Sequence, residues 1–388
     1  MNKSSHPDPA EQARLPRPTP APDGAKQPLS ERPPSVSSFE EILPFRTDAE
    51  LRERYLNFFG GLRLGKLLED FDLSAGRTAY NHAQGWERGL TIVTAACDRI
   101  DLLDELRSNR DLRVRASVNW TGRSSMEVGL QVASEDGNGG WQAVARAYFI
   151  MVARQGETSA AVNPLVPQTD EEHRRFQEGE QRQQQRRAMA QNNYLKHTPT
   201  AEESVRLHRL FLRTKHQQIT GVPMYETQRQ ATLLMHPQSR NIHNKIFGGY
   251  LMRQAFELAW NITYLHCRCP PQFVCMDHMY FFQPVEIGAI LSFTGFVIHT
   301  DGLHLVIEVT TEVIHPQTGR TQITNICYFT FSALDEFGQP QAVPMVISHT
   351  YEEGLRYLDG AKRLRLGEEL RRAKGVRSAS KSETSYPH

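Results

Sequence analysis

Two adjacent glycines, Gly248 and Gly249, open an apolar helical pattern in the second half of the chain. The first N–H groups of a helix lack partners and carry partial positive charge, and glycine lets a ligand carbonyl approach them closely. We therefore expect the Gly249 amide to bind an oxyanion, with a packing turn as the alternative. Asp72 lies in a second helical pattern, on an otherwise apolar face where aspartate is disfavoured unless it has a role or reaches water. Together, a carboxylate and oriented amides promote attack on a carbonyl group.

The helices that carry these residues belong to two similar segments of the chain. The segments 62–79 and 248–262 have apolar residues at helical spacing, and each precedes three β-rich runs that are separated by turn residues. Equivalent positions lie between 179 and 184 residues apart, as in the pairs Gly65 and Gly249, and Asp98 and Asp277. One helix followed by antiparallel strands, repeated once, predicts an α+β fold in which each sheet covers the apolar face of its helix.

This duplication leads us to divide the chain of 388 residues into five parts. The first part is rich in proline and polar residues, and we expect it to be disordered. The stretch between the two copies is polar on almost all sides, so we interpret it as a solvated helical linker rather than an RNA-binding element. The predicted parts are a tail (1–45), a first domain (46–168), a helical linker (169–228), a second domain (229–345) and a C-terminal extension with a tail (346–388).

Composition excludes several classes of partner. The 45 basic and 44 acidic residues give a net charge of +1, which offers no general attraction for nucleic acid or an anionic membrane. No apolar run is long enough to span a membrane. The five cysteines have no paired spacing, which favours a reducing compartment over a disulfide framework. We expect no metal, because His266, Cys267 and Cys269 lie together without a distant fourth ligand.

The segment HPQSRNIHNKIFGGYLMRQAFELAW, residues 236–260, resembles the signature of the acyl-CoA hydrolases with the hotdog fold. Further phrases, among them RLGKLLEDFD, VNWTGRSSMEV, QPVEIG and RYLDG, extend the resemblance from about residue 45 to residue 360. Over this length the chain looks like the mitochondrial acyl-CoA thioesterase 9 type. The resemblance implies two tandem hotdog domains, each a long helix wrapped by an antiparallel sheet, and hydrolysis of acyl-CoA to free fatty acid and coenzyme A.

The resemblance also implies a composite site, with an asparagine from the loop before one helix and an aspartate from the other domain's helix. Asn241 matches the asparagine, with Asn244 as a competitor and an Asx turn as the structural alternative. The acid is expected seven residues after the second glycine, which is Asp72 in the first copy and Phe256 in the second. Asp72 is then the base or nucleophile; a solvated acid on the helix surface is the alternative.

In the mirror site, Asn57 occupies the position of Asn241, and Phe256 replaces the acid. We expect this second site to be inactive unless Glu257, one residue out of register, reaches it. For coenzyme A, the resemblance points to the turn Arg123, Ser124 and Ser125 as a phosphate contact, with Gly248 beside the thioester. A plain hairpin turn explains the same three residues equally well.

The main alternative function is a non-catalytic acyl-CoA-binding or regulatory hotdog protein, favoured by the missing acid at Phe256. A hydratase would need an Asp and a His that act together as acid and base, and neither helix carries a well-placed pair of this kind. We expect acyl-CoA as the partner, no cofactor other than the coenzyme A of the substrate, and a dimer or trimer of double hotdogs. By resemblance the compartment is the mitochondrion, although the N-terminal segment is a poor presequence, and the cytoplasm is the alternative.

Overall fold

A computed structural model describes residues 29–137, 139–191, 199–216, 219–239, 245–335 and 337–373. Residues 1–28 of the expected N-terminal tail and residues 374–388 of the C-terminal tail lie outside the described residues. The expectation of disorder is wrong for the end of the N-terminal tail, because Phe39–Leu43 pairs with another strand and Phe45 is fully buried. The helices are α2 (Ala49–Tyr55), α3 (Leu64–Ala83), α4 (Asp170–Gln191), α5 (Ala201–Lys215), α6 (Gly248–Cys267) and α7 (Tyr351–Ala373), with short 3₁₀ turns at Pro34–Val36, Met224–Thr227 and Pro237–Ser239. None of the helices in these ranges is long and apolar enough to cross a membrane.

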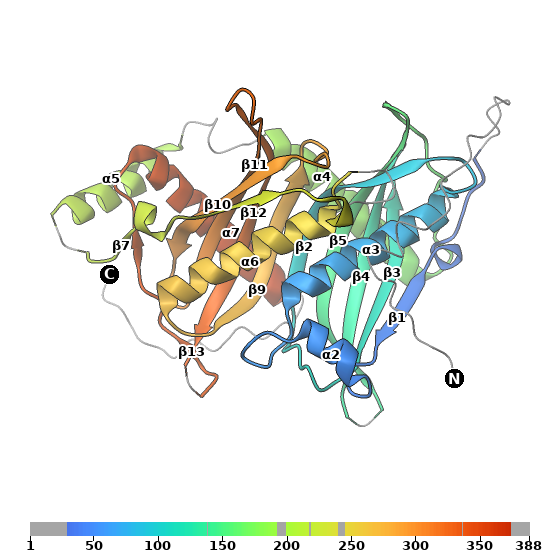
Figure 1. The fold of residues 1–388 in the computed structure, drawn as a ribbon, viewed down its shortest axis with the longest axis horizontal. Helices are drawn as coiled ribbons and strands as arrows, with labels where there is room; N and C mark the ends of the chain where they lie inside the picture. The colour runs from blue at the N-terminus through green and yellow to red at the C-terminus, as the bar shows by residue number, and fades with distance from the viewer. Residues whose placement is uncertain are drawn as a thin grey trace.

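The strands form one long antiparallel sheet and one small parallel pair (Figure 1). Two further short strands, β6 and β13, pair with the strands β5 and β12 of the long sheet. Along the long sheet their order is β1-β3-β4-β5-β2-β9-β12-β11-β10-β8. The second half of this order repeats the first half in reverse, so that each strand of one copy has a counterpart at the same distance from the centre. The strands of the first half are β1 (Phe39–Leu43), β2 (Thr91–Leu102), β3 (Leu112–Thr121), β4 (Ser125–Glu135), β5 (Trp141–Gln155) and β6 (Thr158–Ser159). Those of the second are β7 (Val222–Pro223), β8 (Arg229–Leu234), β9 (Pro271–Phe281), β10 (Ile290–Thr300), β11 (His304–Ile314), β12 (Thr321–Leu334), β13 (Pro340–Gln341) and β14 (Val346–Ile347).

Helices α3 and α6 lie side by side on one face of this sheet (Figure 1). Each buries the apolar stripe that its sequence predicts, with Leu67, Phe71 and Ala75 fully buried on α3 and Met252 and Ala255 on α6. The hydrophobic effect of this burial is what holds a helix against a sheet. Each half is thus a long helix wrapped by antiparallel strands, which confirms the predicted fold class.

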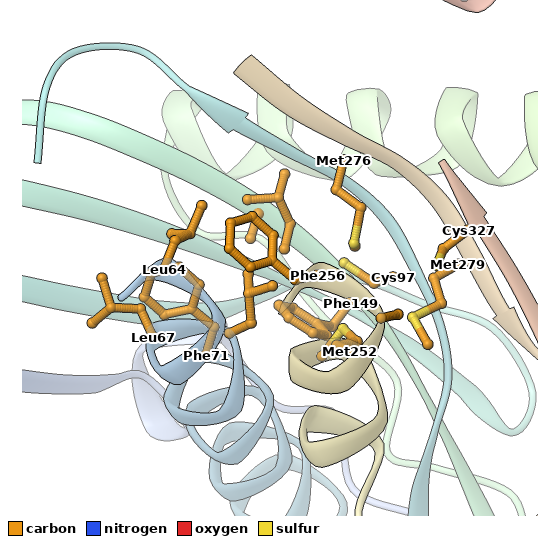
Figure 2. Close-up of a cluster of buried hydrophobic side chains, with 14 of the residues drawn as sticks. Leu64, Leu67, Phe71, Cys97, Phe149, Met252, Phe256, Met276, Met279 and Cys327 are labelled. Carbon is orange, nitrogen blue, oxygen red and sulfur yellow. The ribbon is translucent and has the colours of Figure 1, made fainter. Parts of the chain in front are cut away.

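The two halves join edge to edge through β2 and β9. These strands pair antiparallel, with Arg99 opposite Asp277, and the Arg99 Nη1 atom lies 2.6 Å from Asp277 Oδ1 at a buried position. On the helical side, sulfur-containing residues from both halves pack with Phe149 and Phe256, as Figure 2 shows. Because the strand pairing and the hydrophobic core both continue across this junction, the two halves form one continuous unit.

The polar helix expected as a linker, α4, covers the outer face of the first half of the sheet, and α7 covers the second half. The expectation of a solvated helix is wrong for one side of α4, because Arg182 forms an ion pair of 2.6 Å with the fully buried Glu127. On α7 the equivalent residue, 181 positions later, is Arg363. The guanidinium of Arg182 lies over the ring of Tyr148, and that of Arg363 lies over Tyr328. The duplication therefore includes the outer helices; the domain boundaries given above stay a prediction.

Candidate active site

Asp72 lies in the middle of α3, where it faces the first turn of α6. Its side chain is buried, and its Oδ2 atom accepts a hydrogen bond of 2.7 Å from the Gly249 amide. Its other oxygen, Oδ1, accepts a hydrogen bond of 2.6 Å from the Thr94 hydroxyl on β2. The carboxylate is therefore held from both halves of the chain, by α3 and β2 of the first and by α6 of the second.

Burial raises the pKa of Asp72 to about 6, because a charge in an apolar environment loses its hydration. The hydrogen bonds from Thr94 and from the Gly249 amide oppose this effect, since each stabilises the ionised form. A carboxyl group with a pKa near 6 is mostly ionised at neutral pH and is a stronger base than an exposed aspartate. These are properties that general base catalysis requires.

Both glycines are required by the close approach of α3 and α6. A Cβ atom on Gly249 would lie 2.6 Å from the Phe247 ring and 2.9 Å from the Glu69 backbone. A Cβ atom on Gly248 would lie 3.1 Å from Asp72 Oδ2. The Gly249 amide, expected to bind an oxyanion, donates to Asp72 in this structure, whereas the Gly248 amide has no acceptor among the described residues.

No direct contact with Asp72 is described for the other residues predicted for this site. Asn241 and its competitor Asn244 lie outside the described residues. The turn with Arg123, Ser124 and Ser125 joins β3 to β4, and its backbone is fixed by a hydrogen bond of 2.8 Å from the Ala153 amide to the Ser124 carbonyl. Ser125 is opposite Val152 on β5, which is opposite Val93 on β2, so the turn lies at the same end of the sheet as Thr94.

The mirror site beside Gly65 has a different character. Phe256 lies against Gly65 and packs into a group of aromatic rings with Phe273, Phe329 and Phe331. Glu257 forms ion pairs of 2.7 Å with Arg63 and 3.0 Å with Arg253. Among the described residues, no carboxylate accepts from the Gly65 amide in the way that Asp72 accepts from Gly249.

Asn57, the mirror counterpart of Asn241, has a structural function in its own loop. Its side-chain oxygen accepts hydrogen bonds from the amides of Phe59 (2.9 Å) and Gly61 (3.1 Å). This is the Asx-type turn that short polar side chains commonly form. The side-chain oxygen of Asn57 thus accepts hydrogen bonds from its own loop.

Thr94 was not among the residues predicted from the sequence. Its only sequence feature is that it is a polar residue within an apolar strand, a feature shared with Thr91. The irregular pairing of β2 and β5 between Thr94 and Ala96 changes the direction of side chains along β2. Such bulges cannot be located from a strand pattern alone.

The residues considered for a metal are also far from this chemistry. The His266 ring bonds to the carbonyl of Pro344 at 2.9 Å. Within the part of the chain that the structure describes, the one group of carboxylates and imidazoles close enough to share an ion is Asp301, His304 and Glu368. This group belongs to the β10–β11 turn and to α7, so it has no part in the site around Asp72.

Comparisons with known proteins agree with the resemblance that the sequence carries. The family model described as "Thioesterase superfamily" matches residues 65–140. The mitochondrial acyl-coenzyme A thioesterase 9 of Bos taurus is 35% identical over 342 residues, which cover 84% of this chain and 77% of the relative. The chain belongs to the acyl-CoA thioesterase family.

Another relative in this family extends the match beyond mitochondrial proteins. The chloroplastic acyl-coenzyme A thioesterase 2 of Humulus lupulus is 32% identical, with 85% of this chain and 81% of the relative covered. Among solved structures, an acyl-CoA hydrolase from Staphylococcus aureus, in complex with butyryl coenzyme A and coenzyme A, is 25% identical with a TM-score of 0.37. The match covers 39% of this chain and 93% of the hydrolase chain. A putative oleoyl thioesterase from Lactobacillus plantarum is 9% identical with a TM-score of 0.49, and covers 77% of this chain and 96% of its own.

Proposed function

We propose that this thioesterase-family chain hydrolyses acyl-CoA to a free fatty acid and coenzyme A at one composite site between its two halves. The observation that carries the proposal is the buried Asp72 carboxylate, held by the Gly249 amide of the opposite half and by the Thr94 hydroxyl. The matches to acyl-CoA thioesterases, which cover 84% and 85% of this chain, support the same reaction.

In this mechanism Asp72 acts as the general base. The ionised carboxylate takes a proton from a water molecule, and the hydroxide adds to the thioester carbonyl carbon. The tetrahedral intermediate collapses when the C–S bond breaks, and the departing thiolate takes up the proton that Asp72 removed from water, which restores the carboxylate. The raised pKa of Asp72 favours proton uptake, while Thr94 and Gly249 fix the orientation of the carboxylate.

The oxyanion of the intermediate needs donors at the start of α6. We assign it to the Gly248 amide, which has no acceptor among the described residues, together with the Asn241 side chain predicted from the sequence. The Gly249 amide reaches the oxyanion only if its bond to Asp72 opens. Fixed amide donors at this position would be worth several kcal/mol in the transition state, about 3–4 for one donor.

For the coenzyme A portion we propose the turn Arg123, Ser124 and Ser125 as a phosphate contact. Support comes from its place at the same end of the sheet as Thr94. The mirror site is proposed to be inactive, because Phe256 supplies no carboxylate and Glu257 is neutralised by Arg63 and Arg253.

We further propose that the protein assembles as a dimer or trimer of double hotdogs, uses no cofactor besides the coenzyme A of its substrate, and works in the mitochondrion. The relatives named above support an organelle, since they are called mitochondrial or chloroplastic. Light scattering of the purified chain tests the assembly, and turnover in the presence of a chelator tests the absence of a metal.

A panel of acyl-CoA substrates from short to long chains tests the proposed activity. Release of free thiol from at least one of them, measured with a thiol reagent, is the expected result. The alternative, a non-catalytic acyl-CoA-binding protein, predicts saturable binding of the same substrates by calorimetry without thiol release. That outcome across the whole panel would remove the hydrolase proposal.

A further inference from the structure

A hollow of about 440 Å³ lies on the outer face of the first half, between α4 and the strands β1, β3, β4 and β5. Side chains alternate between the two faces of a strand. Ser117 and Gly129 line this hollow, whereas their neighbours Val118 and Val128 are buried in the core beneath α3. The hollow is therefore on the opposite face of the sheet from Asp72, and the reaction proposed above does not use it.

The second half of the chain shows what normally fills this position. In the first half, Ser117, Gly129 and Tyr148 lie opposite one another on β3, β4 and β5. In the second half, the corresponding row on β10, β11 and β12 is Phe296, Glu308 and Tyr328. The two rows are equivalent because Arg182 of α4 covers Tyr148 just as Arg363 of α7 covers Tyr328. The first half therefore has a hydroxymethyl group and a glycine where the second has a ring and a carboxylate.

The arginines of the two outer helices have different partners because of this difference in the strands. Arg356 of α7 binds the buried Glu308 at 3.0 Å, and its guanidinium lies 4.8 Å from the centre of the Phe296 ring. The equivalent residue on α4 is Arg175, 181 positions earlier. Arg175 lines the hollow and has an ion pair of 2.9 Å with Glu171 of its own helix, and no carboxylate of the described strands pairs with it. The hollow thus retains the arginine but lacks the anion that its counterpart binds.

The lining of the hollow contains more arginines than carboxylates. Five arginines and two glutamates line it. Arg146 on β5 has no carboxylate partner among the described residues, while Arg115 on β3 pairs with Glu40. Arg174 and Arg182 pair with Glu178, and Arg175 pairs with Glu171, so Arg146 is the lining arginine most available to an anion. Arginine binds phosphate and carboxylate through parallel N–H donors.

We propose that this hollow is a binding site for a phosphate-bearing small molecule, with its anionic group held by Arg146 and Arg175 in the place that Glu308 takes in the second half. The space that Phe296 fills there remains open beside Ser117 for the rest of the ligand. A Cβ atom at position 129 would lie 2.3 Å from the side-chain nitrogen of Asn119, so a larger residue there would require this side chain to move.

Inorganic pyrophosphate is the probe for this proposal, measured by calorimetry on the full chain, with succinate at matched ionic strength as the carboxylate comparison. We expect pyrophosphate to bind, and the double variant Arg146→Gln with Arg175→Gln to weaken binding at least about tenfold, since it removes two charged hydrogen-bonding groups. Ser117→Phe, which imitates the second half, is expected to abolish binding by filling the hollow. Stronger binding of succinate than of pyrophosphate would overturn the phosphate preference.

Two controls separate this site from others. Arg320→Gln, in the exposed β11–β12 turn, removes one arginine from a place without a hollow and is expected to leave pyrophosphate binding unchanged. Arg123→Gln tests the turn proposed for coenzyme A. Binding that is lost in Arg123→Gln but kept in both the double variant and Ser117→Phe would place the anion at the catalytic end and refute the proposal. Circular dichroism checks that each variant is folded.

Discussion

The Gly249 amide donates a hydrogen bond of 2.7 Å to Asp72 Oδ2, and this bond joins the two copies of a duplicated chain. The equivalent contact of the other pair is Gly65 against the ring of Phe256. One side of the molecule has therefore retained a carboxylate at a helix start, and the other has replaced it with an aromatic core. The duplication provides two positions for a site, and we expect the reaction at the one that contains Asp72.

Replacing Asp72 by asparagine is expected to reduce kcat by roughly 10²–10⁴, the range that general base catalysis contributes. Asparagine has nearly the same shape, so the packing of α3 against α6 is retained. The matched control is Asp70→Asn on the same helix, because Asp70 bonds to the Tyr55 hydroxyl and not to the site. Thiol-release kinetics on both variants decide the point; equal activity in the two would remove Asp72 from the mechanism.

The activity of the unmodified protein is expected to rise with pH and to reach half its maximum near pH 6. The reason is that Asp72 acts as a base only when ionised, and burial raises its pKa to about 6. Measurement of kcat/KM between pH 4.5 and 8.5, chosen as a range of roughly two units on each side, gives the midpoint. A midpoint near the ordinary aspartate value would show that the buried carboxyl does not limit the reaction.

The same raised pKa makes a prediction about stability. A carboxyl group whose pKa is higher in the folded than in the unfolded state favours folding below its unfolded value and loses this effect as pH rises through the folded value. Relative to Asp72→Asn, the wild type should thus lose about 2 kcal/mol of unfolding free energy between pH 4 and pH 7, from a shift of about two units. Urea unfolding of both proteins at several pH values measures this difference. Unfolding free energies that change in parallel with pH in the two proteins would contradict the prediction.

Thr94→Val is expected to move the midpoint of the pH profile upward by about one to two units, because the ionised Asp72 loses one of its two donors. Thr94→Ser keeps the hydroxyl and should keep the midpoint near that of the wild type. The pH profile distinguishes this effect from a purely structural one, which would lower activity equally at all pH values. A Val variant with an unshifted profile would show that Thr94 does not influence the acid.

The sequence was informative where a family resemblance could be combined with the internal repeat. The resemblance to hotdog acyl-CoA hydrolases implied an acid seven residues after the second glycine, the repeat located it at Asp72, and the structure places Asp72 in contact with Gly249. Thr94 could not be located in this way, since its direction depends on an irregular pairing in β2. The Arg182–Glu127 pair joins a helix to a strand 55 residues earlier, so no local pattern announces it. A comparison of RFQEGEQR with RYLDGAKR would have revealed the repeated outer helix, because Arg175, Gly179 and Arg182 recur 181 positions later.

Gly249→Ala is expected to destabilise the protein by about 1–3 kcal/mol, because the added methyl group meets the Phe247 ring and the backbone of Glu69. It should also reduce activity, since α6 must move away from Asp72. Gly76→Ala is the matched control within α3, where nothing lies within 4 Å of the new methyl group. There the change should stabilise by about 0.5–1 kcal/mol, the usual gain of alanine in a helix. Thermal unfolding of both variants tests this contrast, and similar melting temperatures would contradict it.

Glu257→Gln tests whether the mirror site contributes to turnover. The Glu257 carboxylate is about one-third exposed and pairs with Arg63 and Arg253, so its loss should cost about 0–1 kcal/mol of stability. Activity should stay within about twofold of the wild type, because a pair of this kind does not touch Asp72. Active-site titration with a slow substrate should also give one site per chain before and after the substitution. A fall in activity comparable to that of Asp72→Asn, or a titre of two sites, would show that the second copy still performs the reaction.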